Sequence, residues 1–377
     1  MYKQYQDFLS QLQNTAKYRK LPESYHTKTS LNFASNDYLL LSRHPEIIKA
    51  TQEALQQYGC GATGSRLLTG NYPLIKEFEA RIAKDKHTEH ALIFASGYQA
   101  NQSALMALCH PKILGQNALV FFDKFNHASL YQAMSQNPSS LIRYRHLDMN
   151  HLESLLQKNH HRSAFKFIVS ETIFGMDGDI APIENLITLC ERYDCFLYLD
   201  EAHATGLFGP RHYGLSTHFN LSRIPHLVMG TFSKALGSQG AYIACDKVIA
   251  DYLINSCPGF IYTTANSPIT ISAAFAAWKL LPQMTNKVNH IFNLAQHLQI
   301  NLHHGLMPES QTNIVTLILK DEAKTLAYQD ELKQHGVIVS AIRPPTVPPK
   351  TSRLRFAINA SHQIDDIKYL LEVIKKC

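Results

Sequence analysis

The amino-acid sequence predicts an α/β fold, in which a large domain is built on a seven-stranded, mainly parallel sheet and a smaller α+β domain follows it. Short apolar runs bounded by turn residues recur through the middle of the chain, and helix-period segments separate them, which is typical of βαβ units. After about residue 265 longer helices alternate with strands. The 377 residues, 45% of them hydrophobic, suffice for a large core and a smaller one.

The predicted strands of the large domain are apolar runs of the kind that parallel sheets bury on both faces. They cover residues 91–95, 118–122, 141–145, 165–170, 196–199, 227–230 and 241–245. Amphipathic helices are predicted at residues 45–58, 74–84, 99–108 and 182–193. Pro182 stands in the first turn of the last of these helices, where its missing N–H costs no helical hydrogen bond.

The last third of the chain has a different pattern. Helices are predicted at 269–281, 287–304, 322–335 and 364–375, and strands at 313–319, 337–342 and 354–358. The pairs Pro344-Pro345 and Pro348-Pro349 interrupt this series with an extended loop. The sequence therefore predicts an N-terminal segment at 1–44, a large domain at 45–265 and a C-terminal α+β domain at 266–377.

Composition and charge argue against several classes of protein. The seven cysteines are odd in number and form no C-x-x-C pair, so neither disulfides nor a zinc or other metal site is expected. No apolar stretch approaches the roughly 18 residues of a membrane span, and residues 1–10 do not resemble a signal peptide, so we expect a cytoplasmic protein. The charge of +6 is dispersed, which argues against nucleic-acid binding and is compatible with a small anionic substrate.

One lysine follows the end of a predicted strand. Lys234 comes after the apolar run 227–230, next to Thr231 and Ser233 and before the flexible segment 237–240. In open α/β sheets ligands bind outside the carboxyl ends of the strands, so this position suits a functional amine. A lysine in a surface loop is the alternative interpretation of this residue alone.

A carboxylate and an imidazole follow the end of another predicted strand. Asp200 and His203 come directly after the apolar run 196–199. Chemistry on pyridoxal 5'-phosphate (PLP) needs a carboxylate that keeps the pyridine nitrogen protonated, and a donor such as His203 at the phenolic oxygen would tune the imine. The alternative is that Asp200 caps a helix and His203 is an ordinary polar residue.

Two further segments could complete such a site. The sequence passes from the strand at 91–95 through Gly97 and Tyr98 into a helix, whose first N–H groups can bind a phosphate. His127 follows the strand at 118–122, and its imidazole could lie flat against an aromatic ring. Each signal is weak by itself, because many strand-to-helix turns use Ser-Gly and many histidines are structural.

Together these segments resemble, over nearly the whole chain, the α-oxoamine synthases, a family of fold-type I PLP-dependent transferases. The matching motifs are Asn32-Phe-Ala-Ser-Asn36-Asp-Tyr-Leu, Gly61-Ala-Thr-Gly-Ser-Arg66-Leu-Leu-Thr-Gly70, Asn126-His-Ala-Ser-Leu, Met176-Asp-Gly-Asp, Asp200-Glu-Ala-His-Ala-Thr-Gly, Gly230-Thr-Phe-Ser-Lys and Tyr262-Thr-Thr-Ala. The segments from Ile342 to Pro349 and from Thr351 to Arg355 are similar to the corresponding segments of the family members that make a biotin precursor.

The resemblance implies a decarboxylative condensation of L-alanine with an acyl-CoA or acyl-carrier thioester, the pimeloyl thioester in the biotin branch. The matching positions give each residue a role. Lys234 would hold PLP as a Schiff base and then act as acid and base at Cα, Asp200 would pair with the ring nitrogen, His203 would contact the phenolic oxygen, and His127 would stack on the ring. The phosphate or ring contacts would be Gly97, Tyr98 and Thr231, with Thr264 reaching the phosphate from the partner subunit of a homodimer.

The substrate positions implied by the resemblance lie nearer the ends of the chain. Arg355 and Asn36 match the site for the amino-acid carboxylate, and Arg19 and Thr351 match the acyl-thioester site. Two residues depart from the family pattern: Gly175 replaces the usual serine before Met-Asp-Gly-Asp, and Leu40 stands in the usual Tyr-Leu-Gly-Leu segment. Both departures bear on the acyl substrate rather than on the cofactor.

Other functions share parts of this pattern. An α-oxoamine synthase that uses glycine or a long-chain acyl-CoA would differ mainly in the proline-rich segment 342–349. A PLP aminotransferase would keep the lysine and the aspartate but would need no thioester site. An α/β protein that binds PLP without turnover is the non-enzymatic alternative.

Overall fold

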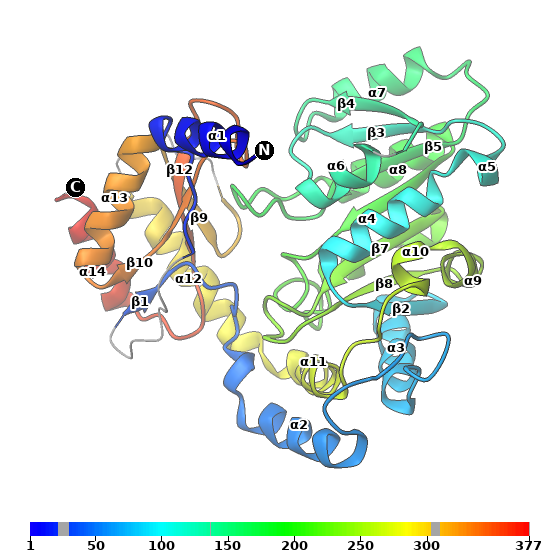
Figure 1. The fold of residues 1–377 in the computed structure, drawn as a ribbon, viewed down its shortest axis with the longest axis horizontal. Helices are drawn as coiled ribbons and strands as arrows, with labels where there is room; N and C mark the ends of the chain where they lie inside the picture. The colour runs from blue at the N-terminus through cyan, green and yellow to red at the C-terminus, as the bar shows by residue number, and fades with distance from the viewer. Residues whose placement is uncertain (22–29, 136, 303–309, 377) are drawn as a thin grey trace. The chain divides into compact units, whose positions relative to one another are not determined.

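The structure, a computed structural model, describes residues 1–21, 30–135, 137–302 and 310–376. The chain forms two compact units, shown in Figure 1. The sheet unit comprises Asp37–Phe174 and Ile180–Asn286, and the C-terminal unit comprises Met1–Asn36, Gly175–Asp179 and Lys287–Cys377. The first and last parts of the chain therefore fold together.

Among the described residues, seven strands form the sheet of the sheet unit, in the order β2-β8-β7-β6-β5-β3-β4. Their bounds are β2 His90–Phe94, β3 Leu119–Asp123, β4 Ser140–Tyr144, β5 Lys166–Glu171, β6 Cys195–Asp200, β7 His226–Thr231 and β8 Ala241–Cys245. The strands from β4 to β7 in this order pair in parallel, whereas β8 pairs antiparallel with both β7 and β2. The predicted α/β fold with a mainly parallel, seven-stranded sheet is confirmed.

The sheet is buried on both faces, as its continuous apolar strands predict. On β3, Val120 and Phe122 belong to one core cluster, and their neighbours Leu119 and Phe121 belong to the other. Helices α4 and α9 contribute to the first cluster, and α7 and α8 to the second. Because side chains alternate across a strand, the apolar residues of β3 pack alternately against the two helical layers.

Helices and short 3-10 turns cover the sheet unit (Figure 1). Their bounds are η1 Leu41–Arg43, α2 Pro45–Tyr58, α3 Pro73–Lys86, α4 Gly97–Leu108, α5 Pro111–Leu114, α6 Ala128–Ser135, α7 Met149–Lys158, α8 Ile183–Tyr193, η2 Leu215–His218, η3 Leu221–Arg223, α9 Lys247–Ser256, α10 Pro258–Ile261, α11 Pro268–Leu280 and η4 Leu281–Gln283. The predicted helices at 45–58, 74–84, 99–108 and 182–193 correspond to α2, α3, α4 and α8.

The C-terminal unit contains a small antiparallel sheet and a two-stranded parallel pair. The sheet has the order β11-β12-β9, and β1 pairs with β10. The strands are β1 Leu31–Asn32, β9 Ile314–Lys320, β10 Val337–Ile338, β11 Ser340–Ile342 and β12 Ser352–Ala357, and the helices are α1 Tyr2–Asn14, α12 Thr285–Asn301, α13 Glu322–Gln334 and α14 Ile364–Ile374. Residues 303 and 304 of the predicted helix 287–304 lie outside the described residues.

The structure differs from the sequence interpretation at two places. The single strand predicted at 337–342 is wrong, because Val337 and Ile338 pair with β1 and the following residues pair with β12. The boundaries of the two units also differ from the predicted boundaries at residues 44 and 265. Helix α11 belongs to the sheet unit, and its Ser272 hydroxyl donates to the Ala50 carbonyl of α2 at 2.8 Å. In both cases the deciding partner is distant in the sequence.

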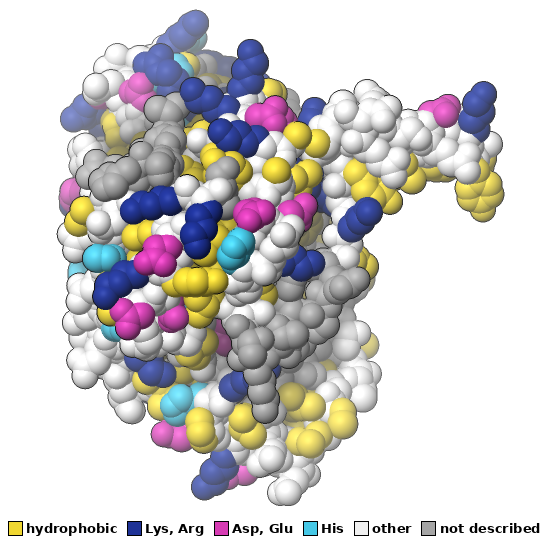
Figure 2. All heavy atoms as spheres, turned by 90° about the vertical axis from the view of Figure 1, so that its left-hand side faces the viewer, with side chains coloured by type: hydrophobic (Ala, Val, Ile, Leu, Met, Phe, Trp, Pro, Cys, Tyr) yellow, Lys and Arg dark blue, Asp and Glu magenta, His cyan; other side chains and the backbone are white. Residues whose placement is uncertain are grey.

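The described surface over α13 and α14 carries charges of both signs. Figure 2 shows Lys and Arg side chains interspersed with Asp and Glu side chains on this face. Such mixing is typical of a helix face in contact with solvent. Among the described residues, no helix combines the length and the apolar character that a membrane crossing requires.

Candidate active site

The sequence-predicted cofactor residues follow strands that end at one edge of the sheet. Strands β3, β6 and β7 run in parallel through β5, and β2 runs in the same direction as β7 because both are antiparallel to β8. Asp200 therefore ends β6 at the same edge where His127 and Lys234 follow β3 and β7, and Gly97 follows the end of β2. This edge is where ligands bind in open α/β sheets.

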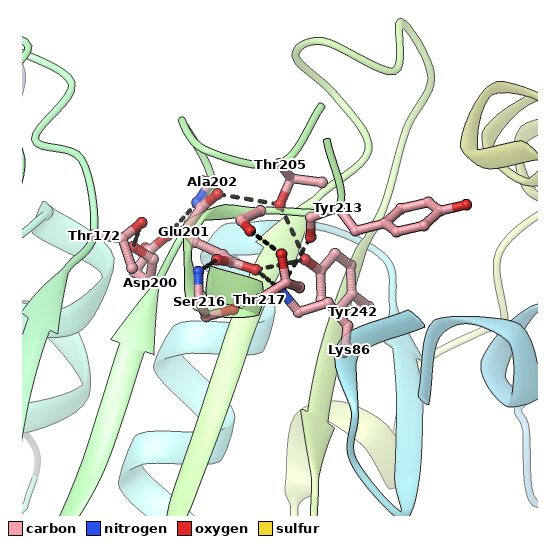
Figure 3. Close-up of polar contacts among 11 residues, drawn as sticks. Lys86, Thr172, Asp200, Glu201, Ala202, Thr205, Tyr213, Ser216, Thr217 and Tyr242 are labelled. Carbon is pink, nitrogen blue, oxygen red and sulfur yellow. Dashed lines mark hydrogen bonds and ion pairs between the residues drawn. The ribbon is translucent and has the colours of Figure 1, made fainter. Parts of the chain in front are cut away.

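Asp200 is the last residue of β6 and is buried, with 4% of its surface exposed. Its Oδ1 accepts a hydrogen bond from the Ala202 N–H at 2.9 Å, and its Oδ2 accepts one from Asn101 Nδ2 at 2.7 Å. Its backbone carbonyl accepts from the Thr172 N–H at 2.8 Å (Figure 3). Both carboxylate oxygens of Asp200 are therefore held in place as hydrogen-bond acceptors.

A buried ion pair anchors the segment that follows Asp200. The Lys86 ammonium, at the end of α3, forms an ion pair with Glu201, and both side chains are fully buried. Lys86 also donates to the Ser216 hydroxyl at 2.7 Å, and the Tyr242 hydroxyl donates to Glu201 Oε1 at 3.1 Å (Figure 3). A Cβ at Gly214 would lie 2.3 Å from Glu201 Oε1, so only glycine fits beside this carboxylate.

His127 lies beyond the end of β3, and its ring is oriented by Ser129. The Ser129 N–H donates to His127 Nδ1 at 3.2 Å, so Nδ1 is an acceptor and the proton of the neutral ring is on Nε2. Desolvation, together with the positive charge of Lys234, lowers the pKa of His127, although the charge of Asp200 opposes this shift. The imidazole is therefore neutral near pH 7, as suits a ring that stacks on another aromatic ring.

His203 and Lys234 complete the edge. The Nδ1 atom of His203 forms a hydrogen bond with the Tyr38 hydroxyl at 2.9 Å. Lys234 is half-buried in the turn after β7, where its backbone carbonyl accepts from the Gly237 N–H at 2.9 Å. Its ammonium is close enough to His127 and Glu171 to influence the pKa of each. The structure thus brings the predicted lysine, aspartate and His127 into one electrostatic cluster.

The start of α4 forms a cradle next to the end of β7. Ser96 caps the helix, because its hydroxyl accepts from the Gln99 N–H at 3.2 Å and its carbonyl accepts from the Ala100 N–H. The N–H groups of Gly97 and Tyr98 point out of the first turn, as helix geometry requires, and Thr231 adjoins Gly97. Backbone N–H groups at a helix start, with the hydroxyls of Thr231 and Ser233 nearby, are suited to a phosphate dianion.

Replacement of Gly97 by alanine tests this cradle. A Cβ there would lie 3.8 Å from Thr231 Oγ1, without a clash, but in the space between the helix and the strand. Alanine also favours a helix by about 1 kcal/mol over glycine. We therefore expect Gly97→Ala to bind PLP about 10-fold more weakly, measured by equilibrium dialysis. The thermal midpoint of the cofactor-free protein should stay the same or rise, and unchanged PLP affinity would contradict the assignment.

Sequence reasoning missed one acidic residue, Glu171, and one uncharged polar residue, Asn101, at this edge. Glu171 ends β5, is buried, and accepts a hydrogen bond from the His127 backbone N–H. Burial and the negative charge of Asp200 raise the pKa of Glu171 well above its usual value. Asn101 lies on α4 between buried alanines, with 1% of its surface exposed. An asparagine on the apolar face of a predicted helix was the signal that could have identified it.

Thr264 pairs with a different part of the chain from the residues described above. It is exposed, and it forms an isolated antiparallel bridge with Ser65, in the glycine-rich loop 61–70. The adjacent Ala265 N–H donates to the Gly64 carbonyl at 3.0 Å. Tyr98, by contrast, follows Gly97 in the first turn of α4, and 48% of its surface is exposed.

Within the C-terminal unit, Arg355 is brought together with Asn36 and Gly175. Its Nε donates to the Gly175 carbonyl at 2.6 Å, and both terminal nitrogens lie 3.4 Å from Asn36 Oδ1. The departure at Gly175 is compatible with this contact, because the bond uses a backbone oxygen. Sequence reasoning did not foresee that Asp177, two residues on, forms a buried ion pair with Arg353.

The two residues that match the acyl-thioester site both contact the proline-rich segment 342–349. The Arg19 guanidinium donates to the Thr346 hydroxyl at 3.2 Å, and the Thr351 hydroxyl donates to the Pro348 carbonyl at 2.7 Å. Arg343 of the same segment donates to the Ala16 carbonyl. The structure therefore places both residues along one segment of the C-terminal unit.

Leu40, the other departure from the family pattern, has a left-handed backbone conformation with φ of 56° and ψ of 37°. A non-glycine residue in this region costs roughly 1–2 kcal/mol relative to the right-handed one. The chain thus keeps at Leu40 the backbone conformation that glycine usually provides, and 37% of the leucine surface is exposed.

Comparisons with known proteins agree with this geometry. The model for the family "Aminotransferase class I and II" matches residues 28–374. A protein of Paramagnetospirillum magneticum, provisionally named 8-amino-7-oxononanoate synthase, is 45% identical over 346 residues, which cover 91% of this chain and 87% of the relative. The 8-amino-7-oxononanoate synthase of Gluconacetobacter diazotrophicus is 41% identical over 350 residues, covering 92% and 87% of the two chains.

Solved structures show the same fold. Serine palmitoyltransferase from S. paucimobilis, with a bound adduct of PLP and myriocin, superimposes with a TM-score of 0.90 at 24% identity, covering 100% of this chain and 96% of that one. The 8-amino-7-oxononanoate synthase of Francisella tularensis superimposes with a TM-score of 0.79 at 25% identity, covering 93% and 98%.

Proposed function

The chain belongs to the class I and II aminotransferase family and, within it, to the 8-amino-7-oxononanoate synthases, and on that premise we propose that it condenses L-alanine with a pimeloyl thioester in biotin biosynthesis. The products would be 8-amino-7-oxononanoate, CO2 and the free thiol of CoA or of a carrier protein. The protein is a PLP-dependent acyltransferase. The observation that supports the proposal most strongly is the common position of Lys234, Asp200 and His127 at the carboxyl edge of the sheet.

The residues at this edge fit the chemical groups of PLP. The start of α4 offers N–H groups for the phosphate, Asp200 is a buried carboxylate with a hydrogen bond to each oxygen, and Lys234 is an amine close enough to influence its neighbours. PLP, when bound, supplies an electron sink that stabilises negative charge at the Cα of an amino acid. The proposal therefore assigns the phosphate to Gly97, Tyr98 and Thr231.

Each polar side chain at the carboxyl edge of the sheet then has a proposed role. Lys234 would hold the cofactor through its amine and would also be the group that moves the proton at the Cα of the amino acid. Asp200 would hold the proton on the ring nitrogen, and His203, oriented by Tyr38, would donate to the phenolic oxygen. His127, which is neutral near pH 7, would cover the ring face and exclude water.

We propose that Arg355 and Asn36 bind the carboxylate of L-alanine. Arg355 is buried, and its contacts with Asn36 are long, at 3.4 Å, so a substrate carboxylate would replace weak hydrogen bonds with charge-assisted ones. The hydrogen bond from Arg355 Nε to the Gly175 carbonyl would keep the guanidinium plane in the same orientation when the carboxylate binds. Arg19 and Thr351 would bind the acyl thioester along the proline-rich segment 342–349.

We also propose a homodimer in which Thr264 reaches the phosphate of the partner subunit. In this chain Thr264 is exposed and pairs with Ser65 rather than with the residues around Gly97. A contact from a second copy would use this exposed hydroxyl, and two-fold symmetry would then give two composite sites. Gel filtration of a fully active monomer would argue against this assembly.

A substrate panel tests the proposed reaction. The purified protein, loaded with PLP, is given acyl-CoA substrates of increasing chain length with L-alanine, glycine or L-serine, and CoA release is followed with a thiol reagent. We expect release with pimeloyl-CoA and L-alanine and little release with glycine. Preference for glycine or for long acyl chains would instead identify another α-oxoamine synthase, and no release with any acyl-CoA would refute the synthase assignment.

A further inference from the structure

A buried asparagine connects two of the proposed cofactor residues. Asn101, on the second turn of α4, donates from its Nδ2 atom to Asp200 Oδ2 at 2.7 Å and to the Ser129 hydroxyl at 3.0 Å. Its Oδ1 accepts from the Tyr198 hydroxyl at 2.9 Å. Both N–H groups and the carbonyl of the amide are therefore engaged.

These three contacts fix the orientation of the amide. If the group were turned by 180°, Oδ1 would face the carboxylate oxygen of Asp200, and two acceptors would oppose each other without a proton between them. The Tyr198 hydroxyl, which ends a fully buried side chain on β6, supplies the matching donor on the other side. Asn101 thus presents a donor, and only a donor, to Asp200.

The same chain of hydrogen bonds extends to His127. Nδ1 of His127 accepts from the Ser129 N–H, and it lies 2.8 Å from the Ser129 hydroxyl. Because that hydroxyl accepts from Asn101, its own proton is available for Nδ1. The direction of every bond from Asp200 to His127 is then determined, and it leaves the imidazole proton on Nε2.

Asp200 needs such support because another carboxyl lies beside it. Glu171 and Asp200 are the last residues of β5 and β6 and are register partners, and both are buried. Their interaction means that a single negative charge is favoured over two. Burial and the negative charge of Asp200 raise the pKa of Glu171 well above its usual value, which favours a proton on Glu171. Asn101 and the Ala202 N–H both donate to the Asp200 oxygens and hold that carboxylate in place.

We propose that Asn101 is a positioning residue that holds the Asp200 carboxylate in place for the ring nitrogen of the cofactor and, through Ser129, fixes the tautomer of His127. This inference rests on the proposed PLP function of Asp200. Asn101 itself touches neither cofactor nor substrate in this scheme, and its effect passes through Asp200. Titratable groups that interact with Asp200 include Glu171 on β5, Tyr198 on β6, Tyr242 on β8 and His127 after β3. Lys234, after β7, interacts in turn with Glu171 and His127.

The test compares the wild type with Asn101→Leu, which keeps a similar volume and removes every hydrogen bond. The visible absorbance of the PLP-loaded protein is titrated with pH, and PLP affinity is measured by dialysis. Without this donor, the Asp200 carboxylate would no longer be held against the ring nitrogen, and the ring would withdraw less charge from the Lys234 nitrogen. We therefore expect the midpoint of the absorbance titration to rise by about 1 pH unit. We expect PLP affinity to fall about 10-fold.

Two further variants make the result decisive. Tyr198→Phe removes the hydroxyl that donates to Asn101 Oδ1, so the Asn101 amide is held less firmly. The midpoint of the absorbance titration should therefore rise, but by less than in Asn101→Leu. Ser103→Ala, on the same helix, removes another buried hydroxyl and should leave the midpoint unchanged. An unshifted midpoint in Asn101→Leu, or in Tyr198→Phe if the leucine variant does not fold, overturns the inference. A wild type that takes up no PLP would overturn the proposed function instead.

Discussion

Replacement of Lys234 by alanine is expected to lower kcat/KM for CoA release by roughly 10⁴-fold or more, because the variant loses both the covalent attachment of PLP and the base that moves the Cα proton. The fold should be retained, since Lys234 is half-buried in a turn and its backbone carbonyl, which accepts from the Gly237 N–H, is unaffected. PLP should still bind through the phosphate cradle at the start of α4, but more weakly.

The attachment itself is measured on the wild type. Borohydride reduction of the PLP-loaded protein, followed by proteolysis and mass spectrometry, should place the added mass on the peptide that contains Lys234. Lys247→Ala provides the matched control, because Lys247 is an exposed lysine of the same unit that pairs with Asp251. Reduction that labels another lysine, or a Lys234→Ala variant with near-normal activity, would contradict the assignment.

Replacement of Lys86 by methionine is expected to lower the free energy of unfolding by about 3–5 kcal/mol. Lys86 and Glu201 are both fully buried, so removal of the ammonium leaves a carboxylate without its cation, which still accepts from the Tyr242 hydroxyl and the Ser216 N–H. Chemical denaturation at pH 7 measures the loss. Arg223→Met, which removes an exposed cation near Glu191 and Glu184, should change stability by less than about 1 kcal/mol.

A second variant separates the lost charge from the lost packing. In Lys86→Met, the Glu201 carboxylate stays buried but has lost its cation. Addition of Glu201→Gln should restore much of the stability at pH 7. A double variant that is less stable than Lys86→Met would contradict this explanation.

The fold, and the position of Lys234 and Asp200 at one edge of the sheet, could be predicted from the sequence because their signals are local. The apolar runs of β3, β6 and β7 are continuous because both faces of the sheet are covered. Asp200 ends β6, and Lys234 comes three residues after the end of β7. The rule that parallel strands present their carboxyl ends at one edge then groups these residues without knowledge of the packing.

The supporting residues could not be predicted in this way because their partners are distant in the sequence. Asn101 meets Asp200, and Lys86 meets Glu201, across separations of 99 and 115 residues. Glu171 looks like an ordinary strand end until β5 and β6 are placed in register. The same holds for Val337 and Ile338, whose pairing with β1 depends on the N-terminal segment.

The proposed reaction is tested most directly by the fate of the amino-acid carboxyl group. The PLP-loaded protein is incubated with pimeloyl-CoA and L-alanine labelled with ¹³C in the carboxyl group, and labelled CO2, free CoA and the amino-ketone product are quantified together. The account predicts that all three appear in equal amounts. Formation of labelled pyruvate without CoA release would identify transamination, and would contradict the assignment of this chain as a synthase.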